Sequence, residues 1–449
     1  MSKQRIQLSD HFTYSRLLRF VLPCIGTMLF TSIYGIVDGL CVSNFVGKTA
    51  FAAVNLIMPV PMLVGSVGFM LGTGGSAIVG ITLGEGDQKK ADRYFTLFLL
   101  AALVSVSVLA VLGIVFLRPI AVLLGAKGEL LDYAVRYGRI LMVSLPTFAL
   151  QNMFQSFFVT AEKPHLGFWF TVGAGCTNMV LDVLMVGIWG WGVEGAAIAT
   201  FISQLVGGVL PVFYFIDRSN SSRLHLCKTS FYSKVLRDAC INGSSELMTN
   251  LSMSLVNILY NYQLLRLAGE NGVAAYGVIM YAAFLFVAVF VGYAVGSAPI
   301  VSFHYGARNH AEVHNLYRKS LRLIAVVAVT LTLASMFIIP CVARIFVGYD
   351  AELLALTSRA FRLYALSFLI MGFNVYASSF FTALGDGVTS ALISFLRTLA
   401  FQVIAILLLP LLLGIDGIWL AVTAAELAAL AVSSAMLLTK DKVFHYRKA

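Results

Sequence analysis

About a dozen apolar segments of helix length, separated by short polar or glycine- and proline-marked turns, dominate the 449-residue chain. Hydrophobic residues make up 59% and charged residues 12% of the sequence, whereas about a quarter of the residues are charged in typical soluble domains. Because a helix needs about 20 apolar residues to cross a bilayer, these segments predict an all-α polytopic membrane protein. No basic, aromatic-interleaved segment predicts a nucleic-acid partner.

We predict twelve membrane-spanning helices, which follow the apolar runs. Their approximate ranges are 17–42, 50–80, 94–117, 133–159, 165–188, 193–216, 235–266, 273–303, 319–341, 356–383, 389–413 and 416–438. The basic cytoplasmic linker 217–234 divides them into a first lobe, residues 1–216, and a second lobe, residues 235–449, which ends in a short cytoplasmic tail. With both termini in the cytoplasm, about 21 Lys and Arg lie near helix ends on the inner side and about 7 on the outer side, as the positive-inside rule requires.

The two lobes are copies of one another at a constant offset of roughly 222 residues. Gly84 aligns with Gly306, and Asn152 aligns with Asn374. Because six helices separate corresponding points, both copies enter the membrane from the same side, as a parallel repeat of two six-helix bundles. Such repeats place the substrate cavity between the halves and move by rocking one half against the other.

Two acids lie inside apolar segments of the first lobe. Asp182 follows Asn178 by four residues, a helical spacing that stacks the amide and the carboxylate on one face. A carboxylate at membrane depth costs roughly 2.5 to 3.5 kcal/mol on insertion scales, so Asp182 and Asp38 need a reason to be there. At the repeat offset Asp182 aligns with Ile404, and Asp38 aligns with Tyr260. The acids therefore belong to one copy only, which favours a functional cation site over a shared structural role.

Several motifs, taken in order and together with the duplication, carry a family resemblance. They are the run from Pro23 to Asp38, LGTGGSAIVGITLGEGDQKKA after the second helix, the Asn178 to Asp182 element, WGVEGAAIAT and the turn FFTALGDG. Over essentially its whole length the chain resembles the multidrug and toxic compound extrusion (MATE) transporters, and within them the bacterial DNA-damage-inducible-protein-F-like branch. The resemblance implies two bundles in a V shape and cation-driven export through an acidic site in the first lobe.

The resemblance also implies site residues. Asp38, Asn178, Asp182 and Thr200 match the cation-site pattern position by position, and Tyr34 matches a cavity-lining position.

One departure concerns the second lobe. In exporters resembling the vibrio-type sodium-coupled branch, helix ten carries an acid where this chain has Asn374, while Glu246 matches the acid on helix seven. We therefore place Glu246 and Asn374 in the substrate cavity and leave a sodium site in this lobe unassigned. The alternative for Glu246 is a solvated carboxylate near a cytoplasmic helix end, or one paired with Arg237.

A mechanism follows from electrostatics. Desolvation disfavours the charged form of a buried carboxylate, so the acid site is expected to bind H+ or Na+ from outside while the chain expels a lipophilic cation. Tyr34, Phe30, Phe154 and Phe158 are expected to give the substrate an adaptable aromatic wall. We predict a secondary active multidrug antiporter that works as a monomer in the bacterial cytoplasmic membrane, with the lipid bilayer and small-molecule drugs or organic cations as its partners.

Alternatives remain at this point. A flippase of lipid-linked oligosaccharide or another lipid shares the wider superfamily, but it is expected to line its cavity with several arginines. Here only Arg397 lies mid-helix, with Arg136 and Arg139 near a helix start. An enzyme is not predicted, because no Ser/His/Asp set and no His pair at membrane depth is visible. Without a P-loop, ATP drive is not predicted either. His310, Glu312 and His314 are interpreted as solvated surface and not as a zinc site, since the order HAEVH differs from HExxH. We predict no cofactor and no structural metal.

Overall fold

The computed structural model describes residues 6–46, 48–348 and 350–447, and helices are the only regular elements among them. In chain order they are α1 Tyr14–Phe45, α2 Lys48–Ile57, α3 Pro59–Gly84, α4 Gln88–Leu123, α5 Gly128–Thr160, α6 Pro164–Asp182, η1 Val183–Ile188, α7 Gly192–Gly208, α8 Leu210–Ile216, α9 Ser233–Gly306, α10 His310–Val347, α11 Ala351–Ala365, α12 Phe368–Ala383, α13 Gly387–Phe395, η2 Leu396–Ala400, α14 Phe401–Leu413, α15 Ile415–Thr439 and α16 Asp441–Phe444. The segments η1 and η2 are π-helical.

The sequence marks several helix starts by capping side chains. The side-chain oxygens of Asp87, Asn309 and Asp386 accept backbone N–H groups in the first turns of α4, α10 and α13, which satisfies donors that have no partner inside a helix. Pro59 and Pro164 begin α3 and α6, where a missing N–H and a fixed φ cost nothing.

Nine helices in the described residues are long and apolar enough to cross a membrane, or ten if the bent pair α11 and α12 is one span. Two features account for the difference from the predicted twelve. The 74-residue α9 is broken at Gly269, whose φ of 61° and ψ of −152° are not helical, so α9 contains two spans. The 33-residue α5 carries Glu129 in its first turn and packs against α3, α4 and α7, so it lies among the spanning helices despite its lower apolarity.

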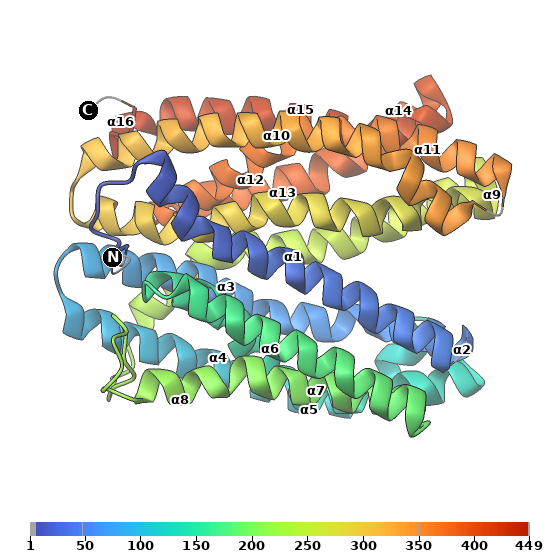
Figure 1. Cartoon of the computed structure of the whole chain (residues 1–449), viewed down its shortest axis with the longest axis horizontal. Helices are drawn as coiled ribbons and strands as arrows, with labels where there is room; N and C mark the ends of the chain where they lie inside the picture. The colour runs from blue at the N-terminus through green and yellow to red at the C-terminus, as the bar shows by residue number, and fades with distance from the viewer. Residues whose placement is uncertain (1–5, 47, 349, 448–449) are drawn as a thin grey trace.

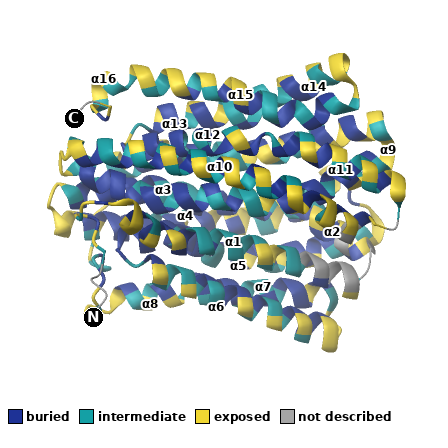
Figure 2. Ribbon diagram, turned by 45° about the horizontal axis from the view of Figure 1, so that its top comes forward, coloured by how far each residue is buried: buried dark blue, intermediate teal, exposed yellow. Residues whose placement is uncertain are grey.

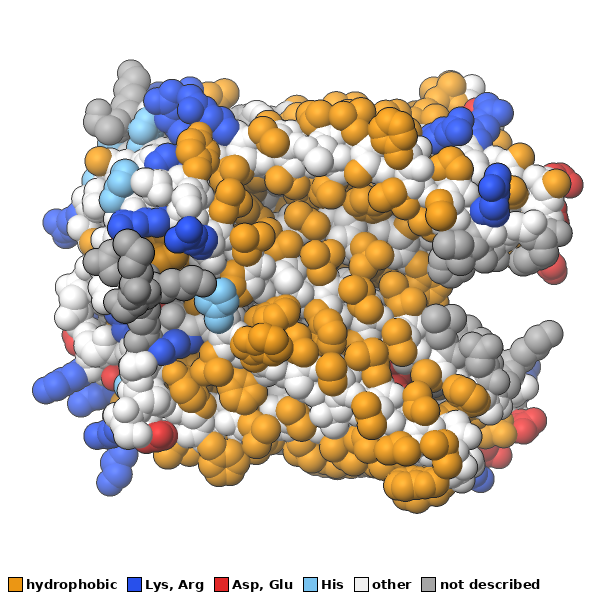
Figure 3. All heavy atoms as spheres, viewed as in Figure 1, with side chains coloured by type: hydrophobic (Ala, Val, Ile, Leu, Met, Phe, Trp, Pro, Cys, Tyr) orange, Lys and Arg blue, Asp and Glu red, His pale blue; other side chains and the backbone are white. Residues whose placement is uncertain are grey.

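The two halves share one core at one end and separate at the other. A cluster of buried residues that includes Leu17, Val79, Ile300 and Phe380 draws on both halves. A second cluster belongs to the second half alone, and a third belongs to the first half alone. Figure 1 shows the halves as two layers, with α2 to α8 in one and α9 to α16 in the other. Helix α1 begins over the second half and crosses to the first, packing on both α9 and α6, and both termini lie at one end. At the other end the space-filling view is indented between them, as in a V (Figure 3).

A close seam between α3 and α9 joins the halves, and it follows the sequence repeat. A Cβ at Gly84 would lie 2.0 Å from the carbonyl oxygen of Phe303, and a Cβ at Gly306 would lie 2.0 Å from that of Ile81. Gly84 and Gly306 correspond in the repeat, as do Ile81 and Phe303, so each contact is the symmetry copy of the other. The seam therefore lies on the axis that relates the two halves.

The surface has the distribution expected of a protein that spans a bilayer. Large apolar side chains such as Val115, Trp169 and Phe337 are exposed along the helices, and buried residues concentrate inside the bundle (Figure 2). Lys and Arg side chains gather at the end that holds the termini, with an apolar belt between the two ends (Figure 3). The chain is a multi-pass membrane protein.

Candidate functional site

The two acids of the first half face each other between α1 and the end of α6. Asp182 is fully buried, and its carboxyl group lies close enough to that of Asp38 for a hydrogen bond between the side chains. Both oxygens of Asp182 and Oδ1 of Asp38 still lack a protein partner in good hydrogen-bond geometry. Neither acid belongs to any of the ion pairs found among the described residues. Two carboxyl groups thus share a buried site to which no Lys, Arg or His of the described residues contributes an ion pair.

Neutral polar groups surround this acid pair. Asn178, one turn before Asp182 on α6, is buried, and its amide nitrogen has no partner in the described structure. Tyr137 of α5 is also buried, is near enough to feel the charges of both acids, and has an unpartnered hydroxyl group. Because buried polar atoms are normally satisfied, these free atoms indicate a place for an ion, a proton or water.

Tyr34 stands at the edge of the same site. It lies near Asp38 and within hydrogen-bond reach of Gln151 on α5. Its ring is 6.2 Å from that of Phe30, and both rings pack against Gly175 of α6, where a Cβ would lie 2.5 Å from Phe30. Tyr34 and Phe30 therefore link the acid pair to the packing of α1 on α6.

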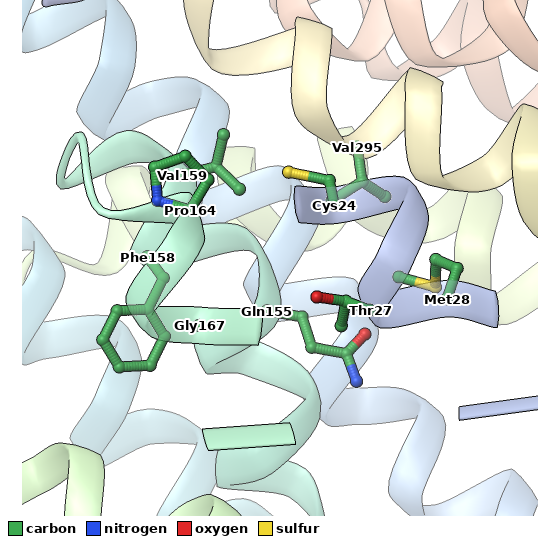
Figure 4. Close-up of a pocket in the computed structure, with 9 residues that line it drawn as sticks. All are labelled: Cys24, Thr27, Met28, Gln155, Phe158, Val159, Pro164, Gly167 and Val295. Atoms are coloured by element: carbon green, nitrogen blue, oxygen red, sulfur yellow. The ribbon is translucent and has the colours of Figure 1, made fainter. Parts of the chain in front are cut away.

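Three other residues of the predicted site make contacts of their own. Thr200 is half-buried on α7, and its carbonyl oxygen accepts a hydrogen bond from Ser203 Oγ at 2.8 Å. Phe154 is a core residue and not part of a cavity wall, because it is 1% exposed and its ring stacks on Phe215. Phe158 lines a small pocket beside α1 with Thr27 and other residues (Figure 4). At about 10 Å³, that pocket holds at most one water molecule.

The second half contains a buried polar cluster of its own. Asn374 on α12 donates to Glu426 Oε2 on α15 at 2.7 Å, and Arg397 Nε of η2 lies 3.8 Å from Glu426 Oε1. Glu426 is 1% exposed and Arg397 14% exposed at the side chain. Asn374 therefore positions the carboxylate that orients Arg397, and it stands behind the cavity instead of lining it.

A larger cavity lies between the halves. It has a volume of about 90 Å³ and is lined by residues of α3 and α5 on one side and of α9, α12, α13 and η2 on the other. Glu246 and Arg397 both line it. Arg237, the alternative partner of Glu246, instead lies 3.3 Å from Asp238. We call this space the inter-lobe cavity.

Sequence reasoning missed two residues of these sites, although signals for both existed. Glu426 lies in the middle of the last apolar segment, which is the criterion that singled out Asp182. Tyr137 aligns with Arg359 at the repeat offset, so its hydroxyl group, like the two acids, belongs to one half only.

The interpretation of the HAEVH stretch as solvated surface is wrong. Glu312 is 6% exposed, and its carboxylate accepts the backbone N–H of Phe12 at 2.9 Å and faces His11 Nδ1 at 2.6 Å. His314 Nδ1 pairs with the carbonyl oxygen of Tyr446 at 2.9 Å. Its burial could not be recognised from the sequence, because its partners His11, Phe12 and Tyr446 lie near the two ends of the chain. No group of metal-binding side chains occurs in the described residues.

The fold and the cavity define the class of this protein: a multi-pass membrane protein of two repeated helical lobes with a cavity between them. Residues 23–184 and 247–408 match the model of the MatE family, so the chain belongs to that family. The predicted MATE resemblance is confirmed, and the branch within the family stays a prediction. Members of this family are transporters, so the chain is not an enzyme.

Relatives cover nearly the whole chain. It is 21% identical over 436 residues to the multidrug export protein MepA of Staphylococcus saprophyticus, covering 96% of this chain and 95% of that protein. It is 22% identical to the MepA protein of Staphylococcus aureus, with the same coverage. A solved outward-facing structure of a multidrug resistance MATE family transporter of the MOP superfamily superposes with a TM-score of 0.91 at 23% identity, covering all of both chains. These likenesses confirm the all-α, two-bundle membrane fold.

Proposed function

We propose that the chain is a secondary active antiporter that exports lipophilic, often cationic compounds, with Asp38 and Asp182 as its coupling site. The observation that carries the proposal is the pair of buried carboxyl groups in hydrogen-bond reach of each other, with oxygens free to bind. The similarity to proteins named for multidrug export supports drugs as the cargo. The separation of the halves at one end provides the outward opening that a rocking exporter needs.

We favour the proton as the coupling ion. Two carboxyl groups that share a buried site repel each other when both are ionised, so the pair can take up one proton and release it when both groups ionise. Sodium is the competing ion, because the carboxylates and the Asn178 amide oxygen are hard oxygen ligands. The experiment below separates the two.

Helix α1 is the element that transmits protonation. Pro23 interrupts its hydrogen-bond ladder, and Thr27 Oγ1 donates to the Pro23 carbonyl oxygen at 2.9 Å. Nothing lies within 4 Å of a Cβ at Gly35, one turn before Asp38. The part of α1 from Pro23 to Asp38 therefore has an interrupted hydrogen-bond ladder at one end and open space at Gly35 near the other. A change in charge at Asp38 can therefore repack this part of the helix.

The orientation follows from charge. The end that holds the termini and most Lys and Arg (Figure 3) is placed in the cytoplasm, and the membrane is the bacterial cytoplasmic membrane. One chain supplies both walls of the inter-lobe cavity, so a monomer suffices for transport.

The test is efflux of a fluorescent lipophilic cation from proteoliposomes under a proton gradient or a sodium gradient, applied separately. We expect Asp38→Asn and Asp182→Asn each to lower gradient-driven efflux at least about tenfold, which corresponds to 1.4 kcal/mol. Glu129→Gln, which changes an exposed acid of the same half, is the control and should keep wild-type efflux. Efflux that persists in both Asn variants contradicts the coupling site, and wild-type protein that moves no cation under either gradient favours the flippase.

A further inference from the structure

The inter-lobe cavity has a hydrophilic lining. Eight of its fifteen lining residues are Ser or Thr, including Thr73, Ser76 and Ser156 of the first half and Ser378 and Ser394 of the second. The remaining neutral ones are Ala and Val, and no aromatic side chain from the described residues lines it. Lipophilic cations are usually held by aromatic walls. The lining instead fits a compact ligand that makes hydrogen bonds.

Two side chains of opposite charge line the cavity. Glu246 of α9 and Arg397 of η2 both line it, and the charges are close enough to affect each other. They do not pair directly, because among the ion pairs of the described residues Arg397 is matched with Glu426 alone. Its Nη1 is buried and has no partner in the described structure. A buried charged donor without a partner is costly, so this nitrogen is available for an acceptor on a ligand.

The charge balance decides what kind of ligand fits. Glu426 neutralises Arg397 and is itself held by Asn374, which leaves the Glu246 carboxylate without a matched cation. A monocation therefore neutralises the cavity, whereas an anion or a zwitterion leaves a net negative charge in a buried space. The unpartnered Nη1 of Arg397 can then donate a hydrogen bond to a neutral oxygen acceptor on that same cation.

We propose that the inter-lobe cavity binds a small hydrophilic organic cation whose ammonium group pairs with Glu246 and whose carbonyl or similar neutral oxygen accepts a hydrogen bond from Arg397 Nη1. The hydroxyl groups of both halves complete the site. The inference rests on the proposed function, since it adds small hydrophilic cations to the lipophilic cargo proposed for the exporter, but it uses a site separate from the Asp38 and Asp182 pair.

A matched set of four small molecules tests the site. L-Alaninamide is a cation with a carbonyl acceptor, isopropylamine is a cation without one, L-alanine is a zwitterion and N-acetyl-L-alanine is an anion at about pH 7. Equilibrium binding of each radiolabelled compound to the purified full-length protein is measured directly. We expect alaninamide to bind at least about tenfold more tightly than each of the other three.

Variants assign the two contacts. Arg397→Lys, which keeps the charge beside Glu426 and removes the free guanidinium nitrogen, should lower alaninamide binding to the level of isopropylamine and leave isopropylamine unchanged, while Glu246→Gln should weaken the binding of both cations. Arg397→Gln should likewise remove the preference for alaninamide, although it leaves Glu426 unpaired and so strengthens the binding of both cations alike. Arg359→Gln is the control, because Arg359 pairs with Asp416 and does not line the cavity.

The outcomes separate this inference from the proposed function. Equal binding of alaninamide and isopropylamine, tighter binding of alanine, or no effect of either Arg397 variant overturns the site. Asp182→Asn should lower gradient-driven efflux at least about tenfold and keep alaninamide binding. Loss of efflux coupling with intact binding thus tests the acid pair alone, while intact efflux of a lipophilic cation with no alaninamide binding contradicts the cavity site alone.

Discussion

At the scale of single residues, Asp386 fixes a junction outside the membrane. Its Oδ1 accepts the backbone N–H of Thr389 at 3.2 Å, and its Oδ2 accepts from Thr389 Oγ1 at 2.7 Å and from Lys440 Nζ at 2.8 Å. One carboxylate thereby caps α13 and holds the end of α15. Burial raises the pKa of Asp386, but the hydrogen bonds from Lys440 and Thr389 outweigh it and keep that pKa below its usual value.

Asp386→Asn should make the stability difference from wild type depend on pH. Because the folded-state pKa is lowered, the stabilisation is present above the unfolded-state value of about 3.9 and is lost as the pH falls through the lower folded-state value. With Lys440 36% exposed, we expect about 0.5–1 kcal/mol near neutral pH. Thermal unfolding of detergent-solubilised protein, followed by tryptophan fluorescence from about pH 7 to about pH 3, measures the difference. A difference that is constant with pH contradicts the assignment.

The acid pair shows what residue-level reasoning can predict. Asp38 and Asp182 were predictable because a carboxylate in an apolar segment is costly wherever it lies. Tyr137 was harder to predict, since a tyrosine is common in apolar helices and only its position beside two acids gives it meaning. The free Arg397 nitrogen could not be predicted either, because it depends on which side of the guanidinium group Glu426 occupies.

At the scale of elements, the α3 and α9 seam depends on the absence of side chains. A methyl group at Gly306 would meet the carbonyl group of Ile81, and backbone cannot move aside as a flexible side chain can. Gly306→Ala should therefore destabilise the protein by about 1–3 kcal/mol, as overpacking does. Gly277→Ala on the same helix is the control, because nothing lies within 4 Å of its Cβ. Thermal unfolding midpoints compare the two, and equal midpoints contradict a tight seam.

The sequence predicted elements well where apolarity decides them. The gap between the predicted spans 235–266 and 273–303 contains Gly269, at which α9 breaks. The π-helical segments were not predictable, since one extra residue per turn leaves the apolar pattern almost unchanged. They matter because η1 directly follows Asp182 and η2 contains Arg397, and π-helical turns are frequent at functional sites.

At the scale of the whole molecule, the N-terminal segment before α1 ties the two halves together at the closed end. The backbone N–H of Leu8 donates to Glu162 Oε1 at 2.9 Å, and Arg223 Nη1 holds the same oxygen at 2.5 Å. The backbone N–H of Phe12 donates to Glu312 Oε1 at 2.9 Å. Glu162 follows α5 of the first half and Glu312 lies on α10 of the second. Sequence reasoning could not find this bridge, because about 150 and 300 residues separate the partners.

If transport rocks one half against the other, this bridge must release when the closed end opens. Replacing both acceptors, Glu162→Gln with Glu312→Gln, weakens the charge-assisted hydrogen bonds, each worth about 1.5–3 kcal/mol, and should shift the population toward the state open at that end. We expect a cysteine placed at Ser379 in the inter-lobe cavity, in an otherwise cysteine-free chain, to react at least about fivefold faster with an impermeant maleimide applied from the cytoplasmic side. Asp10→Asn is the control, because Asp10 lies in the same segment and its carboxylate accepts from Gln7 within it. Unchanged labelling in the double variant shows that the shared core alone holds the closed end. Faster labelling there, with slower labelling from the outside, shows that the first residues of the chain set the balance between the two states.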